Sequence, residues 1–127
     1  MHIWHSEVKK EDIDFQDIVY HANYLEYFDY ARRNILEAKG IYLDELHRNG
    51  VDVVIAHVEL TLKKSLKLHD KFDIKTTFHR SGRLRVIFNQ KIYLADRDTL
   101  VAEATTTIVC VSVQTGKPVL PDAIALS

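Results

Sequence analysis

Acidic residues and a tyrosine–histidine pair lie close together near the start of the chain. Residues 12–24 read Asp-Ile-Asp-Phe-Gln-Asp-Ile-Val-Tyr-His-Ala-Asn-Tyr and lead directly into a stretch with helical periodicity. A carboxylate that faces the amide-rich start of a helix can activate a nucleophile at a point where an oxyanion is stabilised. The segment therefore predicts acyl chemistry, in which a carboxylate works beside a helix N-terminus.

The residues that follow have the periodicity of one long helix over residues 22–39. Apolar residues recur at three- and four-residue steps and form a single stripe. Gly40 is predicted to end this helix as its C′ residue, and a short second helical turn is expected over residues 43–48. We expect the stripe to face the core rather than a ligand pocket, and its members are Tyr24, Phe28, Ala31, Ile35 and Ala38.

The rest of the chain has the composition of β-strands. Strands are predicted over residues 2–9, 51–62, 72–79, 84–94 and 100–113, because these runs are rich in β-branched and aromatic residues and are separated by turn signals. The last four are expected to follow one another as a meander. The pattern predicts an α+β fold in which a curved antiparallel sheet of about five strands wraps one long helix.

The composition limits the class of protein. A length of 127 residues predicts one domain over residues 1–127, and a formal net charge of −1 gives no electrostatic footprint for nucleic acid. No signal peptide and no membrane-spanning run is evident. The single cysteine, Cys110, has no partner for an internal disulfide and is expected to be an inert core residue. We expect a cytoplasmic protein.

The N-terminal segment also resembles a known family signature. The pattern Asp-x-Asp-x-x-x-Ile-Val-Tyr-His-Ala-Asn-Tyr over residues 12–24, with Phe28 and Ala31-Arg32 after it, is similar to that of the 4-hydroxybenzoyl-CoA thioesterase family. The likeness is greatest to the branch of short acyl-CoA thioesterases first known from the bacterial Tol–Pal cluster. Residues 68–74 resemble a turn between strands of that family, and residues 117–121 resemble its tail.

This resemblance implies a fold, an activity and two catalytic groups. The fold is the hotdog, whose sheets pair edge to edge into homodimers and often homotetramers, with active sites at the subunit interface. The activity is hydrolysis of a small aliphatic or aromatic acyl-CoA to the acid and coenzyme A, with no metal or cofactor. The catalytic carboxylate falls on Asp14, as nucleophile or general base, and the oxyanion contact falls on the backbone amide of His21.

The neighbours of these two groups have other expected roles. Asp12 is predicted to end the first strand at the surface, and Asp17 to lie in the N-cap region of the long helix. The His21 imidazole is expected to pack at a subunit interface while its N–H serves the oxyanion. Among the substrate-binding candidates, Tyr20 would form a wall of the site and Asn23 would brace the first helical turn beside the substrate.

Basic residues supply the remaining substrate contacts. Arg80, Arg83 and Arg85 flank a turn where the family carries residues that meet coenzyme A phosphates, and Arg83 and Arg85 are the chosen candidates, since an arginine fork suits phosphate. The alternative is a solvated hairpin end. Lys63 and Lys64 are a second basic candidate. The histidines show no metal-ligand spacing, so no metal site is predicted.

Two other functions are compatible with these residues. One is a hydroxyacyl-thioester dehydratase on the same fold, which needs a histidine placed to remove a proton from carbon. The other is a non-catalytic acyl-CoA binding protein. No histidine signature of that kind stands out in the sequence, and an intact Asp14 argues against the binding protein.

Overall fold

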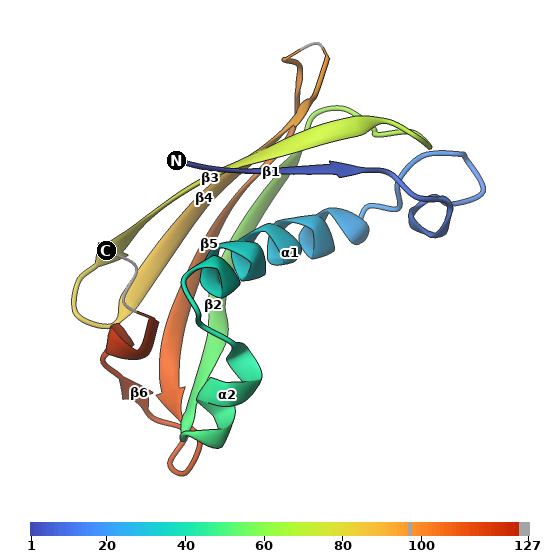
Figure 1. Cartoon of the computed structure of the whole chain (residues 1–127). Coiled ribbons are helices and arrows are strands. Elements are labelled where there is room, and N and C mark those ends of the chain that lie inside the picture. Colours follow the sequence, from blue (N-terminus) through green and yellow to red (C-terminus); the bar gives the residue numbers. More distant parts are fainter. Residues whose placement is uncertain (97, 125–127) are drawn as a thin grey trace.

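A computed structural model describes residues 1–96 and 98–124 of the chain and has one curved antiparallel sheet that wraps a long helix, α1 (Figure 1). The predicted α+β hotdog architecture is confirmed. The helices are α1 (Asn23–Ala38) and α2 (Leu43–Arg48), and the strands are β1 (His2–Glu7), β2 (Val51–Leu62), β3 (Lys71–Ser81), β4 (Arg85–Leu94), β5 (Leu100–Ser112) and β6 (Pro118–Val119). Two 3₁₀ turns lie at Lys10–Asp12 and Pro121–Ile124.

The order of the strands corrects the predicted meander. Of the four strands in that meander, only β3, β4 and β5 follow one another in space, because the sheet order is β1-β3-β4-β5-β2. Strand β2 does not pair with its successor β3; it pairs with β5 from Val51↔Ser112 to Leu62↔Ala102. Within residues 1–96 and 98–124 the sheet has six strands, where about five were predicted. The sixth, β6, spans only two residues and is too short to carry a periodic pattern.

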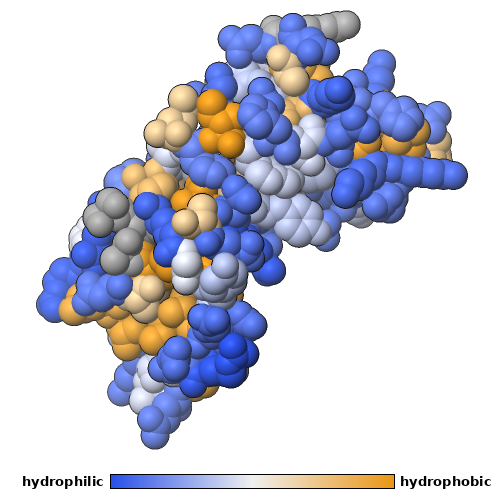
Figure 2. Space-filling view, in the orientation of Figure 1, coloured by the Kyte–Doolittle hydropathy of each residue, from blue (hydrophilic) through white to orange (hydrophobic). Residues whose placement is uncertain are grey.

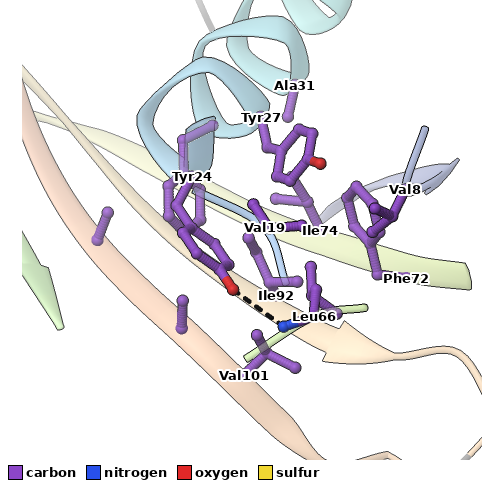
Figure 3. Packing of buried hydrophobic residues seen from close by; sticks show 13 residues of the cluster. Val8, Val19, Tyr24, Tyr27, Ala31, Leu66, Phe72, Ile74, Ile92 and Val101 are labelled. Atoms are coloured by element: carbon purple, nitrogen blue, oxygen red, sulfur yellow. Dashed lines mark hydrogen bonds between the residues drawn. The ribbon is translucent and has the colours of Figure 1, made fainter. Parts of the chain in front are cut away.

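Most of the apolar stripe of α1 forms the core with the concave face of the sheet. The prediction is wrong for Ala38, the last residue of the helix, which is exposed because the buried part of α1 ends at Leu36. Tyr24, Phe28 and Ala31 are buried, which confirms that they are core residues, and they pack with sheet residues such as Phe72 and Ile92 (Figure 3). Burying a side chain as large as Phe28, Phe72 or Ile92 is favourable by ~1.5–3 kcal/mol. This packing fixes where the helix N-terminus lies, and therefore where the preceding loop must sit.

Polar groups in the middle of the helix are also buried against the sheet. Arg32 donates from Nη1 to Gln90 Oε1 at 2.9 Å. The Gln90 amide nitrogen in turn donates to the Phe28 carbonyl at 3.1 Å and to Thr76 Oγ1 at 3.2 Å. Burial lowers the pKa of Arg32, while nearby Asp29 raises it. Because buried polar groups are costly when unpaired, these bonds fix the position of α1 along the sheet.

The two edges of the sheet differ in character. β1 is a six-residue edge strand, whereas β2 is a twelve-residue edge strand whose outward side chains are largely apolar. Large hydrophobic residues of β2 are exposed, among them Ile55 at 54% and Leu62 at 44%. Figure 2 shows apolar surface beside α2, in the region where β2 and β5 lie in Figure 1. A long apolar edge strand with open backbone groups is a template for pairing with another chain.

Candidate active site

The loop between β1 and α1, residues 8–22, is tied to the turn between β2 and β3 by backbone hydrogen bonds. The Val8 N–H donates to the Asp70 carbonyl and the Val19 N–H to the Leu66 carbonyl, both at 2.9 Å. The Tyr24 hydroxyl accepts a bond from the Leu66 N–H at 3.0 Å, as Figure 3 shows. Burial raises the pKa of Tyr24. These contacts set the loop at the N-terminal end of α1.

Asp12 has an anchoring role that differs from its predicted place at the end of the first strand. It lies in the 3₁₀ turn after β1, where Oδ2 accepts bonds from the Tyr27 hydroxyl at 2.8 Å and the Lys9 N–H at 3.1 Å. Burial and this bond to Asp12 raise the pKa of Tyr27. The strand prediction missed this because β1 already ends at Glu7 and the chain turns back toward the helix.

Asp14 is held by a tight turn of its own. Its N–H donates to the Ile18 carbonyl at 2.9 Å, and its carbonyl accepts from the Asp17 N–H at 3.1 Å. One carboxylate oxygen, Oδ1, accepts from the Gln16 N–H at 2.8 Å. No hydrogen bond joins the other oxygen to a residue of the described ranges. The carboxylate is therefore oriented at one oxygen while the second can reach a ligand.

Asp17 does not cap the long helix, contrary to the sequence prediction. The helix begins at Asn23, its N-cap residue is Ala22, and no side chain caps it. Asp17 instead lies in the loop with φ 63°, a left-handed conformation that Asp tolerates better than most residues. The prediction failed because an acidic residue before a helical pattern suits a cap and a turn equally well.

The N-terminus of α1 is consequently open. Alanine is a poor N-cap because it has no side-chain oxygen to accept from the first amides. The backbone N–H of His21 makes no hydrogen bond to another residue within the described ranges, whereas the N–H groups of Asn23 and Tyr24 donate to the Tyr20 and His21 carbonyls. Unpaired amides at a helix start attract a partial negative charge.

Asp14 and His21 line the same cavity. The cavity has a volume of about 280 Å³, near the lower limit for sites of small organic ligands. The buried Tyr24 also lines it, as do Leu62 at the end of β2 and the residues of the turn that follows. The lining residues are Asp14, Gln16, Ile18, Val19, His21, Tyr24, Leu62, Lys63, Lys64 and Ser65.

Tyr20 and Asn23 lie beside this cavity without lining it. The Tyr20 ring is about half exposed and packs on the His21 ring, with centroids 4.4 Å apart. The Asn23 side chain donates to the Asp12 carbonyl at 2.8 Å. Asn23 thus braces the start of the helix, and its amide group is occupied by the protein rather than directed at a ligand.

Arg83 and Arg85 are not brought to this cavity within one chain. We call the end of the sheet beside residues 8–22 the loop end, and the end with the β3–β4 turn the hairpin end. β3 starts at the loop end, where Lys71 pairs with Glu7, and finishes at the hairpin end, where Ser81 pairs with Arg85. At ~3.3 Å per residue the two ends are about 33 Å apart along the strand.

The wall formed by Leu62, Lys63, Lys64 and Ser65 is the part that the sequence largely missed. Lys63 and Lys64 were expected only as a further basic candidate for phosphate. Their N–H groups both donate to the Val101 carbonyl, at 2.8 and 3.0 Å, and this fixes the chain as it leaves β2. The available signal was the basic pair directly after an apolar strand, but its position opposite Asp14 depends on the β2–β5 pairing.

Two structural absences apply to the described parts of the chain. No group of three or more His, Cys, Asp or Glu side chains lies close enough together to hold a metal ion in residues 1–96 and 98–124. Within the same ranges, no helix is long and apolar enough to cross a membrane.

Comparison with known proteins identifies the family. Residues 8–126 match the thioesterase-like superfamily. The acyl-CoA thioester hydrolase YbgC of Escherichia coli O6:H1 is 30% identical over 122 residues, which cover 95% of this chain and 90% of that protein. The chain therefore belongs to the thioesterase-like superfamily of hotdog proteins, in agreement with its resemblance to the 4-hydroxybenzoyl-CoA thioesterases.

Solved structures agree with this assignment. A 1,4-dihydroxy-2-naphthoyl-CoA thioesterase from Synechocystis superposes with a TM-score of 0.90 at 19% identity, over 95% of this chain and 90% of that one. A hypothetical protein from Aquifex aeolicus superposes with a TM-score of 0.87 at 27% identity, over 98% and 99%. The first shows the fold alone. Together with the family match, the hydrolase relatives make this protein a thioester hydrolase.

Proposed function

We propose that the protein hydrolyses a small aliphatic or aromatic acyl-CoA to the free acid and coenzyme A, with Asp14 and the His21 amide as its catalytic groups. The observation that carries the proposal is that both groups line one cavity at an uncapped helix N-terminus. A thioester carbonyl bound there has an amide donor for its oxygen and a carboxylate near its carbon. The relative named as an acyl-CoA thioester hydrolase supports the acyl-CoA part of the proposal.

The reaction follows from these two groups. The carbonyl oxygen of the thioester accepts a hydrogen bond from the His21 N–H, which stabilises the negative charge that develops there. Asp14 either attacks the carbonyl carbon or removes a proton from an attacking water. The C–S bond then breaks and coenzyme A leaves as a thiolate. In the first case water hydrolyses the resulting anhydride and regenerates Asp14. In the second case Asp14 gives the proton it took from water to the leaving thiolate and is again ionised. Neither route needs a metal or cofactor.

We further propose that the active enzyme is a homodimer or homotetramer assembled through β2. Antiparallel pairing of two β2 edges would bury exposed Ile55, Val58 and Leu62 and satisfy their open backbone groups. It would also bring the hairpin end of one chain beside the loop end of the other. This is the arrangement in which Arg83 and Arg85 of one subunit approach the Asp14 cavity of its partner.

The cytoplasmic location and the single catalytic domain over residues 1–127 also stay predictions. The buried thiol of Cys110, whose pKa is raised by burial, is compatible with a reducing compartment. Fractionation of the producing cells would test the location, and limited proteolysis followed by assay of the fragments would test the domain.

The test is release of free thiol from a panel of acyl-CoAs by the wild type and two variants. Asp14→Asn removes the carboxylate but keeps the size and the Gln16 contact, and we expect turnover to fall by about 10²–10⁴-fold. Asp17→Asn is the matched control, since it removes a carboxylate from the same loop and asparagine tolerates positive φ. The control should retain nearly full activity.

The alternatives give different results in the same experiment. A dehydratase would form an enoyl thioester from a 3-hydroxyacyl-CoA without releasing thiol. A non-catalytic binding protein would bind acyl-CoA in calorimetry and release thiol from none of the panel. Normal turnover by a folded Asp14→Asn protein would refute the assignment of Asp14.

A further inference from the structure

A second cavity lies next to the Asp14 cavity and is rich in lysine. Its volume is about 310 Å³, and Lys64, Lys67 and Lys71 line it together with Ser65, Asp70 and Asp96. Lys64 and Ser65 also line the Asp14 cavity. The two hollows are therefore neighbours on either side of the turn that follows β2, and a ligand long enough to occupy both would cross Lys64 and Ser65.

The turn between β2 and β3 holds the three lysines in fixed places. The Lys64 N–H donates to the Val101 carbonyl at 3.0 Å, and the Lys71 carbonyl accepts from the Ala95 N–H at 3.0 Å. Asp70 caps the turn, because its Oδ2 accepts from the Lys67 N–H at 2.9 Å. The backbone is thus hydrogen-bonded at each of the three positions from which the lysine side chains extend: two in the turn and Lys71 at the start of β3.

The charges of this cavity favour an anion. Three ammonium groups face two carboxylates, Asp70 and Asp96, and Asp70 is already engaged with the backbone. In the described ranges none of Lys64, Lys67 and Lys71 lies within 4.0 Å of a carboxylate as an ion pair. Ammonium groups that lack a protein partner and lie around a hollow are suited to phosphate oxygens.

We propose that this lysine cavity binds the phosphate that ends the pantetheine arm of the substrate while the thioester lies at Asp14. The inference rests on the proposed function, because it takes Asp14 as the reacting end. It assigns the phosphate to lysines of the same chain as Asp14, at the loop end, instead of to Arg83 and Arg85 at the hairpin end. The same phosphate occurs in coenzyme A and in the prosthetic arm of acyl carrier proteins, so either could supply it.

The experiment measures binding by calorimetry and needs no turnover. The probes are coenzyme A, 4′-phosphopantetheine and pantetheine, which separate the phosphate from the arm. The variants are Lys67→Gln/Lys71→Gln, Arg83→Gln/Arg85→Gln and a control, Lys117→Gln. Lys117 is an exposed lysine, and its carbonyl accepts a hydrogen bond from the Ser112 N–H at the hairpin end of β5. Val101, which holds Lys64, lies at the other end of β5, about 36 Å away along the strand at ~3.3 Å per residue.

The expected result is a loss that depends on the phosphate. Lys67→Gln/Lys71→Gln should lower the affinity for coenzyme A and for 4′-phosphopantetheine by about fivefold to tenfold, because two exposed charge pairs are worth about that much. The affinity for pantetheine, which has no phosphate, should not change. Lys117→Gln should bind all three as the wild type does. Added salt should reduce the difference between the wild type and the lysine variant, since exposed charges are screened.

Other results would overturn the proposal. Equal binding of coenzyme A by the wild type and Lys67→Gln/Lys71→Gln, with a loss in Arg83→Gln/Arg85→Gln, would place the phosphate at the hairpin end. An equal loss of affinity for coenzyme A and for pantetheine in the lysine variant would mean that the lysines do not contact the phosphate. Thiol release from acyl-CoA by wild type that binds no coenzyme A would reject this inference and leave the proposed hydrolysis intact.

Discussion

The loop end and the hairpin end of the sheet both carry polar residues that the sequence marks for function, yet they differ in how those residues are held. At the loop end, Asp14 and His21 are seven residues apart in the chain, and bonds to the β2–β3 turn hold their loop in place. At the hairpin end, Arg83 and Arg85 are exposed and a full strand away. Asp14 and the His21 amide can therefore act together within one chain. A site that also uses the arginines of the hairpin end needs those residues from a second chain.

The strongest test of this difference concerns the amide at the loop end. His21→Pro removes the backbone N–H and should lower turnover by about 10²–10³-fold, the cost of losing one oxyanion donor. His21→Ala keeps the N–H, loses only the imidazole and should stay close to the wild type. Thiol release measures both, with circular dichroism to check the helix. Equal losses in the two variants would move the function from the amide to the ring.

The second test asks whether the hairpin end acts only through a partner. Ile55→Lys/Val58→Lys places like charges on the exposed β2 edge, and these repel when two such edges meet. We expect a monomer by analytical ultracentrifugation and a loss of turnover of about tenfold or more, because the site loses its partner. Ile3→Lys, on the exposed edge strand β1, is the control and should change neither the oligomeric state nor the turnover. A monomer with full activity would show that one chain suffices.

The smallest effect concerns the anchor of the loop on the helix. Tyr27→Phe removes the bond from the Tyr27 hydroxyl to Asp12 and should lower the free energy of unfolding by about 1–2 kcal/mol at neutral pH. The pKa of Tyr27 is raised above its ordinary value of 10.0 in the folded protein. The stabilising contribution of Tyr27 is therefore complete below about pH 10. It is lost as the pH rises above that value, because Tyr27 ionises at a lower pH in the unfolded chain than in the folded protein.

Urea unfolding at neutral pH and at about pH 11 would check this prediction. The wild type should lose stability between the two, and Tyr27→Phe should lose less. Tyr24, whose pKa burial also raises, would account for the loss that the variant retains. Identical pH dependence in both proteins would mean that Tyr27 is not held as described.

The periodic elements of the fold were predictable from the sequence, and the pairing of distant elements was not. The long helix, the short helix at Leu43–Arg48 and the strand Val51–Leu62 follow from local patterns of apolar residues and from Gly40, which has the positive φ of a helix C′ residue. The position of β2 beside β5 could not be predicted, because strand pairing depends on contacts between residues far apart in the chain.

The same distinction applies to the candidate site. The sequence by itself determined that a carboxylate and a histidine amide lie within seven residues of each other at a helix start, which limits their separation to about 23 Å. Only the tertiary structure decided what faces them. The β2–β5 pairing places Lys63 and Lys64 opposite Asp14, the Tyr27 bond makes Asp12 an anchor, and the length of β3 keeps Arg83 distant. The sequence spacing determines which residues are near one another along the chain, whereas strand pairing and packing determine which distant residues come into contact with them.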